Sequence, residues 1–438
     1  MVELIEYIIG RAGAGKTTYC LEGIRQRLAA GFEAPMQIML VPEHMTFGME
    51  RRLASVMPAG AYMNCQIYGF RRFAQQVLSD TGGNLEPGIT ELGRQLMLKS
   101  ILTTEKDNLK YFVKAASKRG FSEAAVQMID ELKSYRITPA DLKSVTDNLN
   151  EKDSTSNETL LNKLHDLALI YERLQDKMEG CHKKDRSDLL DTLMERMTDA
   201  ELFKDAEIWL DGFLFLNPQE LQLVERLMGL CRGMHISLPM DVNEAGSWKL
   251  RENLQETGTF FRAYKTMQRI DAIAERAGAP KPLVRALKKP FRYGRNEGLA
   301  AIEGLMSGHR PAAVSNKGED FRLVETANCR LEAEMAAGDI VRLVRKRGYN
   351  WSDIGILIRD QQSYGAMLPV VLENYGIPFY MDSKRSCANH PMAELIRSAL
   401  RTVVSGWRYD DVFRCFKTGL FSMPQEAIDR LENYVLEL

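Results

Sequence analysis

The chain has 438 residues, which is too long for one ordinary core and predicts two or three domains. Its hydrophobic content of 45% is ample for such cores, and no run of about 18 apolar residues appears, which excludes a membrane-spanning helix. The formal net charge of -1 excludes a globally basic nucleic-acid binder, so any nucleic-acid contact must come from local grooves. The seven cysteines are scattered without a CxxC pair, so we expect reduced thiols in a cytoplasmic protein.

The most specific motif lies at the start of the chain. A short apolar run at 5–9 leads directly into GRAGAGKT at 10–17, which satisfies the eight-residue P-loop pattern. A strand, a glycine-rich turn and a helix start place backbone N–H groups around one phosphate-sized space. We therefore predict nucleotide binding, with Lys16 reaching the β- and γ-phosphates and Thr17 binding Mg²⁺. The predicted cradle comprises Gly10, Arg11, Ala12, Gly13, Ala14, Gly15, Lys16, Thr17 and Thr18.

Alternating strand and helix signals continue to about residue 80. They predict helices at 17–28, 45–57 and 70–78 and a strand at 37–41. This βαβ pattern predicts a parallel sheet that binds its ligand at the carboxyl ends of the strands. From 91 to about 202, apolar residues recur at helical spacing, which predicts an all-helical insertion.

The α/β pattern resumes after the insertion. A strand at 206–211, a helix at 219–230 and a strand at 235–238 are predicted, and 243–317 is predicted to be a connector containing a helix at 260–277. A second α/β unit is then expected. Its predicted strands are 321–325, 354–358 and 379–381, and its predicted helices are 332–347, 364–375 and two that begin at 391 and 410.

The strand at 206–211 ends in a candidate metal ligand. Asp211 can bind Mg²⁺ there, but the water-activating Glu that directly follows this Asp in P-loop helicases is replaced by Gly212. Strand geometry places Glu207 about 13 Å upstream, too far to substitute. Glu220 falls on the first turn of the next helix. Because a general base typically contributes a factor of about 10²–10⁴ in rate, we expect ATP binding with very slow hydrolysis.

Several segments carry a family resemblance. GRAGAGKT, LVPEHMTFGMERRL at 40–53 and QIYGFRRFA at 66–74 resemble successive N-terminal motifs of UvrD-like superfamily 1 helicases. The chain is more closely similar to the AddB (RexB) family, the B subunits of bacterial AddAB helicase–nucleases. WLDGFLFLNPQEL at 209–221 looks like that family's altered Walker B segment. The segments 353–386 and 390–400 resemble the start of its second helicase-like domain.

The resemblance implies a fold of RecA-like P-loop NTPase domains with a helical insertion. The expected domains are 1–88 and 205–318 for the first RecA-like domain with its connector, 89–204 for the insertion, and 319–438 for the start of a second RecA-like domain. It also implies ATP and Mg²⁺ as cofactors and an AddA-type subunit as the partner in a heterodimeric helicase/exodeoxyribonuclease that repairs double-strand breaks. Family members are normally far longer, so we expect a fragment that lacks the nuclease domain and its 4Fe–4S cluster.

Contacts with single-stranded and end-containing DNA are expected in the first domain, where aromatic side chains could stack on bases and arginines could bind phosphates. The candidates are Phe47, Tyr68, Phe70, Arg71 and Arg72. Two other functions remain open. One is an active UvrD-like helicase in which another acid replaces the missing Glu. The other is a P-loop kinase or GTPase, which fits worse because no NKxD motif is present and a large helical insertion suits helicases better.

Overall fold

The computed structural model divides the chain into two compact units, Met1–Phe321 and Arg322–Leu438. It describes residues 2–57, 64–81, 88–118, 120–152, 158–181, 188–197, 203, 205–241, 256–289, 291–293, 296–309, 321–382 and 387–437.

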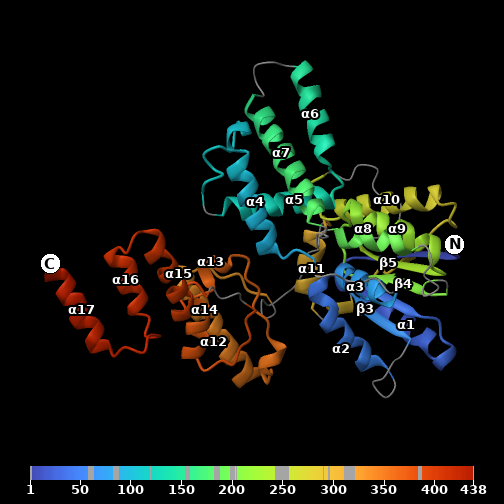
Figure 1. Ribbon diagram of the computed structural model, residues 1–438. Coiled ribbons are helices and arrows are strands. Elements are labelled where there is room, and N and C mark those ends of the chain that lie inside the picture. The colour runs from blue at the N-terminus through green and yellow to red at the C-terminus, as the bar shows by residue number, and fades with distance from the viewer. Residues whose placement is uncertain are drawn as a thin grey trace. The chain divides into compact units, whose positions relative to one another are not determined.

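The first unit is built on a six-stranded, all-parallel sheet (Figure 1). The strands follow the order β3-β2-β4-β5-β1-β6 across the sheet. Their bounds are β1 Leu4–Gly10, β2 Gln37–Leu40, β3 Cys65–Tyr68, β4 Glu207–Leu210, β5 Gly233–Pro239 and β6 Leu283–Ala286. The predicted parallel α/β sheet is therefore confirmed. The chain-distant strands β4 and β5 lie between β2 and β1, so the whole helical stretch is inserted between two parts of one sheet.

Helices cover both faces of this sheet. α1 (Lys16–Leu28) and α2 (Thr46–Val56) pack against one set of strand side chains, which includes Ile8, Met39 and Trp209. The opposite face is covered by α3 (Phe70–Asp80), α8 (Leu189–Arg196), α9 (Pro218–Leu230) and α10 (Phe261–Arg276). Strands that are buried on both faces need apolar side chains in nearly every position, which explains the continuous apolar runs at 7–9 and 208–210.

The insertion forms a second apolar core. It contains α4 (Glu91–Thr104), α5 (Phe121–Ser134), α6 (Pro139–Lys152) and α7 (Glu158–Gly180), as the helical periodicity predicts. The fully buried Asp166 carboxylate of α7 accepts hydrogen bonds of 2.8 Å from the backbone N–H groups of Lys110, Tyr111 and Phe112. One helix of the predicted insertion differs, because α8 packs on α3 and α9 and so belongs to the core of the sheet.

The predicted connector contributes to the first unit. β6 pairs in parallel with β1, and α11 (Glu297–Met306) follows it after the short 3-10 helix η8 (Phe291–Tyr293). The residues of β6 are only exposed or half-buried, so the strand needs no alternation of apolar and polar side chains. The sequence therefore gives no signal for it. The connector prediction is therefore wrong for 283–286, which form a strand of the sheet.

The second unit contains the helices α12 (Cys329–Arg347), α13 (Gln361–Tyr364), α14 (Met367–Asn374), α15 (Pro391–Val404), α16 (Tyr409–Phe416) and α17 (Gln425–Glu437). The strands predicted at 321–325, 354–358 and 379–381 are wrong, since the residues there form no strand. A strand exists only where a neighbour supplies ladder hydrogen bonds. Here Leu323, Leu357 and Tyr380 are at least 90% exposed, so these segments lack the packing that stabilises a sheet.

Candidate nucleotide-binding site

The P-loop connects β1 to α1, as its sequence predicts. Gly15 is the N-cap of α1 and Lys16 is the first helical residue, so the first-turn N–H groups of α1 point into the loop without helical partners. The Lys16 ammonium donates to the carbonyls of Gly10, at 2.8 Å, and Arg11, at 3.0 Å. The loop is thereby folded around the amine that is expected to meet the phosphates.

The candidate metal ligands lie beside each other. The Thr17 hydroxyl donates a hydrogen bond of 2.7 Å to Asp211 Oδ2. Asp211, at the end of β4, is 1% exposed, and its other carboxylate oxygen accepts from the hydroxyl of Ser237 in β5. Among the described residues no three His, Cys, Asp or Glu side chains gather as a metal site, so an ion here would take its remaining oxygens from phosphates and water, as Mg²⁺ commonly does.

The segment after β6 covers the P-loop, a feature that the sequence patterns missed. The backbone N–H of Arg292 donates to the carbonyl of Gly13 at 3.3 Å. Gly13 has a φ of 76°, and a Cβ there would lie 2.7 Å from the Cβ of Arg292, so only glycine allows this approach. Burial lowers the pKa of Lys16, an effect that the Asp211 charge opposes and the Arg292 charge reinforces. Arg292 is therefore a second cation beside the loop.

Arg11 ties the same loop to α11. Its guanidinium lies 3.5 Å from Glu303 of α11 and 4.0 Å from Asp241, which follows β5. Asp241 in turn lies 2.9 Å from the ring of His309. The Arg11 side chain therefore contacts acids of neighbouring elements, and only its backbone is left for the predicted cradle.

Gly212 directly follows Asp211, where the sequence comparison with P-loop helicases predicts the position of the water-activating Glu. Its φ of 86° lies in the left-handed region that side chains rarely adopt. A Cβ at this position would also lie 3.0 Å from Sδ of Met45 and 3.2 Å from Cδ of Pro42. The backbone therefore turns at Gly212 in a way that a simple exchange to Glu would strain.

The two nearby acids have other partners. Glu207 accepts hydrogen bonds from Arg27 and His235, as described below. Glu220 accepts from the backbone N–H of Asn217 at 2.8 Å, and the Asn217 side chain accepts from the Glu220 N–H in return. This capping box fixes the start of α9. Burial raises the pKa of Glu220, although the Asn217 backbone hydrogen bond opposes that shift.

A cavity of 620 Å³ opens at the carboxyl ends of β2, β3 and β4, between the sheet and the helices of the insertion. It is lined by Val41, Pro42, Glu43, Phe70, Arg71, Glu91, Arg94, Asp130, Leu189, Leu190, Phe213, Gln219 and Glu220. The Glu43 carboxylate accepts from the Arg71 backbone N–H at 2.9 Å and so caps the start of α3. This is the edge of the sheet at which parallel α/β folds bind their ligands.

The five candidate DNA contacts do not share one environment. Tyr68 and Phe70 are 8% and 7% exposed, and the Phe70 ring packs 5.1 Å from that of Phe213, so neither offers a free ring face for a base. Phe47 is 76% exposed at the start of α2. Arg71 and Arg72 are exposed at the start of α3, where Arg72 lies 3.3 Å from Glu50. Of the five, Phe47, Arg71 and Arg72 are accessible to a nucleic acid.

None of the helices among the described residues has the length and apolar character that crossing a bilayer requires.

Comparison with known proteins gives consistent matches. A family model described as "ADDB, N-terminal" matches residues 7–303. Three curated relatives, each named as the B subunit of an ATP-dependent helicase/deoxyribonuclease, align with 99% of the chain. The chain is 36% identical over 436 residues to the protein of Heliobacterium modesticaldum, 35% identical over 437 residues to that of Desulforamulus reducens, and 34% identical over 444 residues to that of Geobacillus kaustophilus. The aligned parts make up 35%, 37% and 37% of those proteins, so the chain spans little more than a third of their length.

Proposed function

The chain belongs to the AddB N-terminal family, and on this basis we propose that it is the ATP-binding, helicase-like region of an AddB-type subunit in a helicase–nuclease. In this proposal it works in the cytoplasm with an AddA-type partner at double-strand DNA ends, and it binds single-stranded DNA. ATP with Mg²⁺ binds at the P-loop, and hydrolysis by this chain is slow. For residues 1–438 the proposal covers nucleotide, DNA and partner binding.

The bond between Thr17 and Asp211 carries the nucleotide part of the proposal. Thr17 directly follows the P-loop lysine, and its hydroxyl lies 2.7 Å from the Asp211 carboxylate. P-loop NTPases bind Mg²⁺ through a hydroxyl and a carboxylate of these two kinds. The bound metal ion would neutralise phosphate charge. Lys16, the first-turn N–H groups of α1 and Arg292 would supply the remaining positive potential around the phosphates.

Slow hydrolysis is supported by the surroundings of Asp211. An attacking water needs a carboxylate to orient or deprotonate it. Gly212 has no side chain, and Met45 and Pro42 crowd the space that one would need. Glu207 is hydrogen-bonded to Arg27 and His235, and Trp209 lies between it and Asp211 along the strand.

The test measures binding and turnover separately. Binding of a fluorescent ADP analogue with Mg²⁺ is expected in the parent and is expected to be lost in Lys16→Ala. The control Lys143→Ala, an exposed lysine of the insertion paired with Glu172, should bind like the parent. Turnover of ATP with single-stranded DNA should remain near the Lys16→Ala background. Fast turnover that depends on Lys16 would contradict the slow-hydrolysis part, and failure to bind nucleotide would contradict the whole site.

One observation favours the alternative of an active motor. Glu220 lines the 620 Å³ cavity, and burial raises its pKa, which brings a carboxyl closer to the range of a useful general base. Its hydrogen bond to Asn217 argues for a capping role instead. If the parent hydrolyses ATP, Glu220→Gln should abolish turnover only under the motor hypothesis. The amide still accepts the capping bond, so folding should be preserved.

A further inference from the structure

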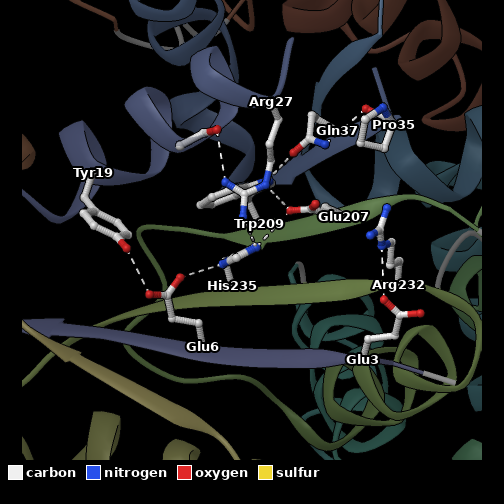
Figure 2. A network of polar contacts seen from close by, with 11 residues as sticks. Glu3, Glu6, Tyr19, Arg27, Pro35, Gln37, Glu207, Trp209, Arg232 and His235 are labelled. Carbon is white, nitrogen blue, oxygen red and sulfur yellow. Dashed lines mark hydrogen bonds and ion pairs between the residues drawn. The ribbon is translucent and has the colours of Figure 1, made fainter. Parts of the chain in front are cut away.

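A buried charge network lies beneath the helix that follows the P-loop (Figure 2). His235 of β5 is 0% exposed and lies between two carboxylates. Its Nδ1 is 2.8 Å from Glu6 Oε2 of β1, and its Nε2 is 3.1 Å from Glu207 Oε2 of β4. Both carboxylate side chains are only 13% exposed. An imidazole that faces a carboxylate from each ring nitrogen satisfies both only when it is protonated on both, so the geometry selects the imidazolium.

The helix α1 reaches into this network from above. Tyr19, Gly23 and Arg27 recur every four residues and therefore share one face of α1. The Tyr19 hydroxyl donates to Glu6 at 3.0 Å, and the Arg27 guanidinium donates to Glu207. Gly23 allows the close approach, because a Cβ there would lie 2.6 Å from the Trp209 ring. The network thus holds α1 at two points, two turns apart.

The same strands carry the P-loop site. Trp209 of β4 and Asp211, which directly follows β4, are two positions apart and therefore lie on one face of the sheet. The same holds for His235 and Ser237 of β5. The Trp209 ring stacks on His235 at 3.9 Å with an interplanar angle of 12°. The His235 network and the Asp211 site are therefore neighbours on the face of the sheet that α1 covers. The position of α1 affects both of them.

Loss of the His235 proton would change the partner of Arg27. A neutral ring that still donates from Nδ1 to Glu6 presents a lone pair at Nε2, which repels the Glu207 carboxylate. Arg27 Nη2 lies 3.3 Å from that nitrogen and can donate to it. In the deprotonated network Arg27 is the group that can donate to His235 Nε2, and the repelled Glu207 carboxylate moves relative to the ring, so both contacts of the guanidinium are rearranged. Arg27 belongs to the last turn of α1.

We propose that protonated His235 is a positioning residue for nucleotide binding, which fixes the P-loop helix through Arg27 and Tyr19, so that loss of this proton weakens nucleotide binding. The inference rests on the proposed ATP-binding function. The charged or titratable groups that face His235, directly or through Glu6, are Glu6 of β1, Glu207 of β4, Arg27 and Tyr19 of α1, and Arg285 of β6, which lies 3.8 Å from Glu6.

Electrostatics agree with this geometry. Burial alone would lower the pKa of His235, but the hydrogen bonds to Glu207 and Glu6 raise it above its ordinary value. Burial alone would raise the pKa of the Glu6 and Glu207 carboxyls. The net effect is a lowered pKa, and the hydrogen bonds to His235 are the largest of the interactions that lower it. The charged form of His235 is therefore favoured, and the ring loses its proton at a higher pH than an unperturbed histidine would.

The first experiment measures the Kd of a fluorescent ADP analogue with Mg²⁺ from pH 6 to pH 9. Both proteins are expected to lose affinity between these pH values. The loss in the parent should exceed the loss in His235→Gln by about fivefold or more. Comparing the two removes the titration of the nucleotide and of Lys16, which both proteins share. His165→Gln, a histidine of the insertion, is the matched control and should follow the parent. Parallel curves for parent and His235→Gln would overturn the role of His235.

A second measurement needs no variant, because His235→Gln could fail to fold. The chain has six histidines, and selective labelling allows each imidazole to be titrated by NMR. By linkage, a proton that strengthens nucleotide binding must itself be bound more tightly in the nucleotide complex. The pKa of His235 should therefore rise when Mg–ADP is added, and an unchanged pKa would overturn the inference. Failure of the parent to bind nucleotide at pH 6 in a Lys16-dependent way would instead overturn the proposed function together with it.

Discussion

The Thr17 hydroxyl donates a hydrogen bond of 2.7 Å to the Asp211 carboxylate, across 194 positions of sequence. The helical insertion lies between these two residues in the chain, and the parallel sheet brings them together because β1 and β4 end at the same edge. The hydroxyl and the carboxylate are therefore held in place by the fold before any ion binds, which lowers the ordering cost of binding.

Asp211→Asn tests this relationship. The amide oxygen can still accept from Thr17, but the negative charge that would bind Mg²⁺ is lost. We expect the gain in nucleotide affinity on adding Mg²⁺ to fall by about tenfold, or about 1.4 kcal/mol, while affinity in EDTA changes little. Titration of the fluorescent ADP analogue with and without Mg²⁺ measures both. Asp147→Asn, on the exposed side of α6, is the control, and an undiminished Mg²⁺ effect in Asp211→Asn would contradict the assignment.

Substitution of Gly212 is expected to cost stability without restoring catalysis. Its φ of 86° makes any side chain cost about 1–2 kcal/mol, and Met45 adds crowding. Thermal unfolding should show most of this loss already in Gly212→Ala. Gly212→Glu should hydrolyse ATP no faster than the parent, because a strained backbone does not hold the carboxylate in place.

The control for Gly212 lies in the next helix. Gly229 is inside α9 with no atom within 4 Å of a new Cβ, so Gly229→Ala should stabilise the protein slightly. If Gly212→Ala behaved like Gly229→Ala, the strain argument would be wrong. Strong DNA-stimulated turnover in Gly212→Glu would show that the position can still take up the role of a general base.

The P-loop, its flanking strand and helix and the position of Asp211 could be predicted from sequence, because each depends on a local pattern. The contact of Arg292 with Gly13 could not, since it joins distant parts of the chain through a short edge strand that has no apolar alternation. The environment of His235 was also beyond prediction. A lone histidine in an apolar strand gives no sign of which carboxylates the neighbouring strands place beside it.

The three strands predicted in 321–381 fail for a related reason. Their apolar patterns suit strands, but a pattern specifies only which residues can enter a sheet. Leu357 is 100% exposed and Tyr380 is 91% exposed, so the partner that would bury them is not among the described residues of this unit. A strand forms only beside another strand, so the apolar pattern of one segment does not determine whether it becomes one.

Stability should pass through a maximum in weakly acidic solution. His235 has a raised pKa in the folded state, so its contribution is fully present below its unfolded pKa of about 6.5 and is lost as pH rises through the folded value. Glu6 and Glu207 have lowered pKa values, so their contribution is present above about pH 4.3 and is lost as pH falls through the folded values. Thermal unfolding from pH 3 to pH 9 measures both limbs.

His235→Gln should remove the high-pH limb selectively. The amide can pair with one carboxylate but carries no proton that titrates in this range. The variant is expected to be less stable than the parent near pH 6 and to approach it at pH 9. Equal losses of stability at both pH values would mean that His235 contributes packing against Trp209 and not charge.

Asp166 should be essential to the helical insertion. Its buried carboxylate accepts three backbone N–H groups of the loop at 110–112, and Asp166→Ala would remove the acceptor that all three share. We expect a loss of about 2 kcal/mol or more in the free energy of unfolding. Asp176→Asn on the exposed side of the same helix should change stability by less than about 0.5 kcal/mol. Similar values for the two variants in urea titrations would contradict the anchoring role.

Phe47 is the accessible aromatic candidate for a DNA base. Its ring is 76% exposed at the start of α2, where packing within the chain gives little reason for an aromatic side chain. If one base stacks on it, Phe47→Ala should weaken binding of oligo-dT by about 1–3 kcal/mol in fluorescence anisotropy at fixed salt. Phe47→Leu keeps an apolar side chain but removes the π-face, so it should lose nearly as much. Full affinity in Phe47→Leu with a loss only in Phe47→Ala would indicate apolar packing instead of stacking, and full affinity in both would exclude Phe47 from the DNA-binding surface.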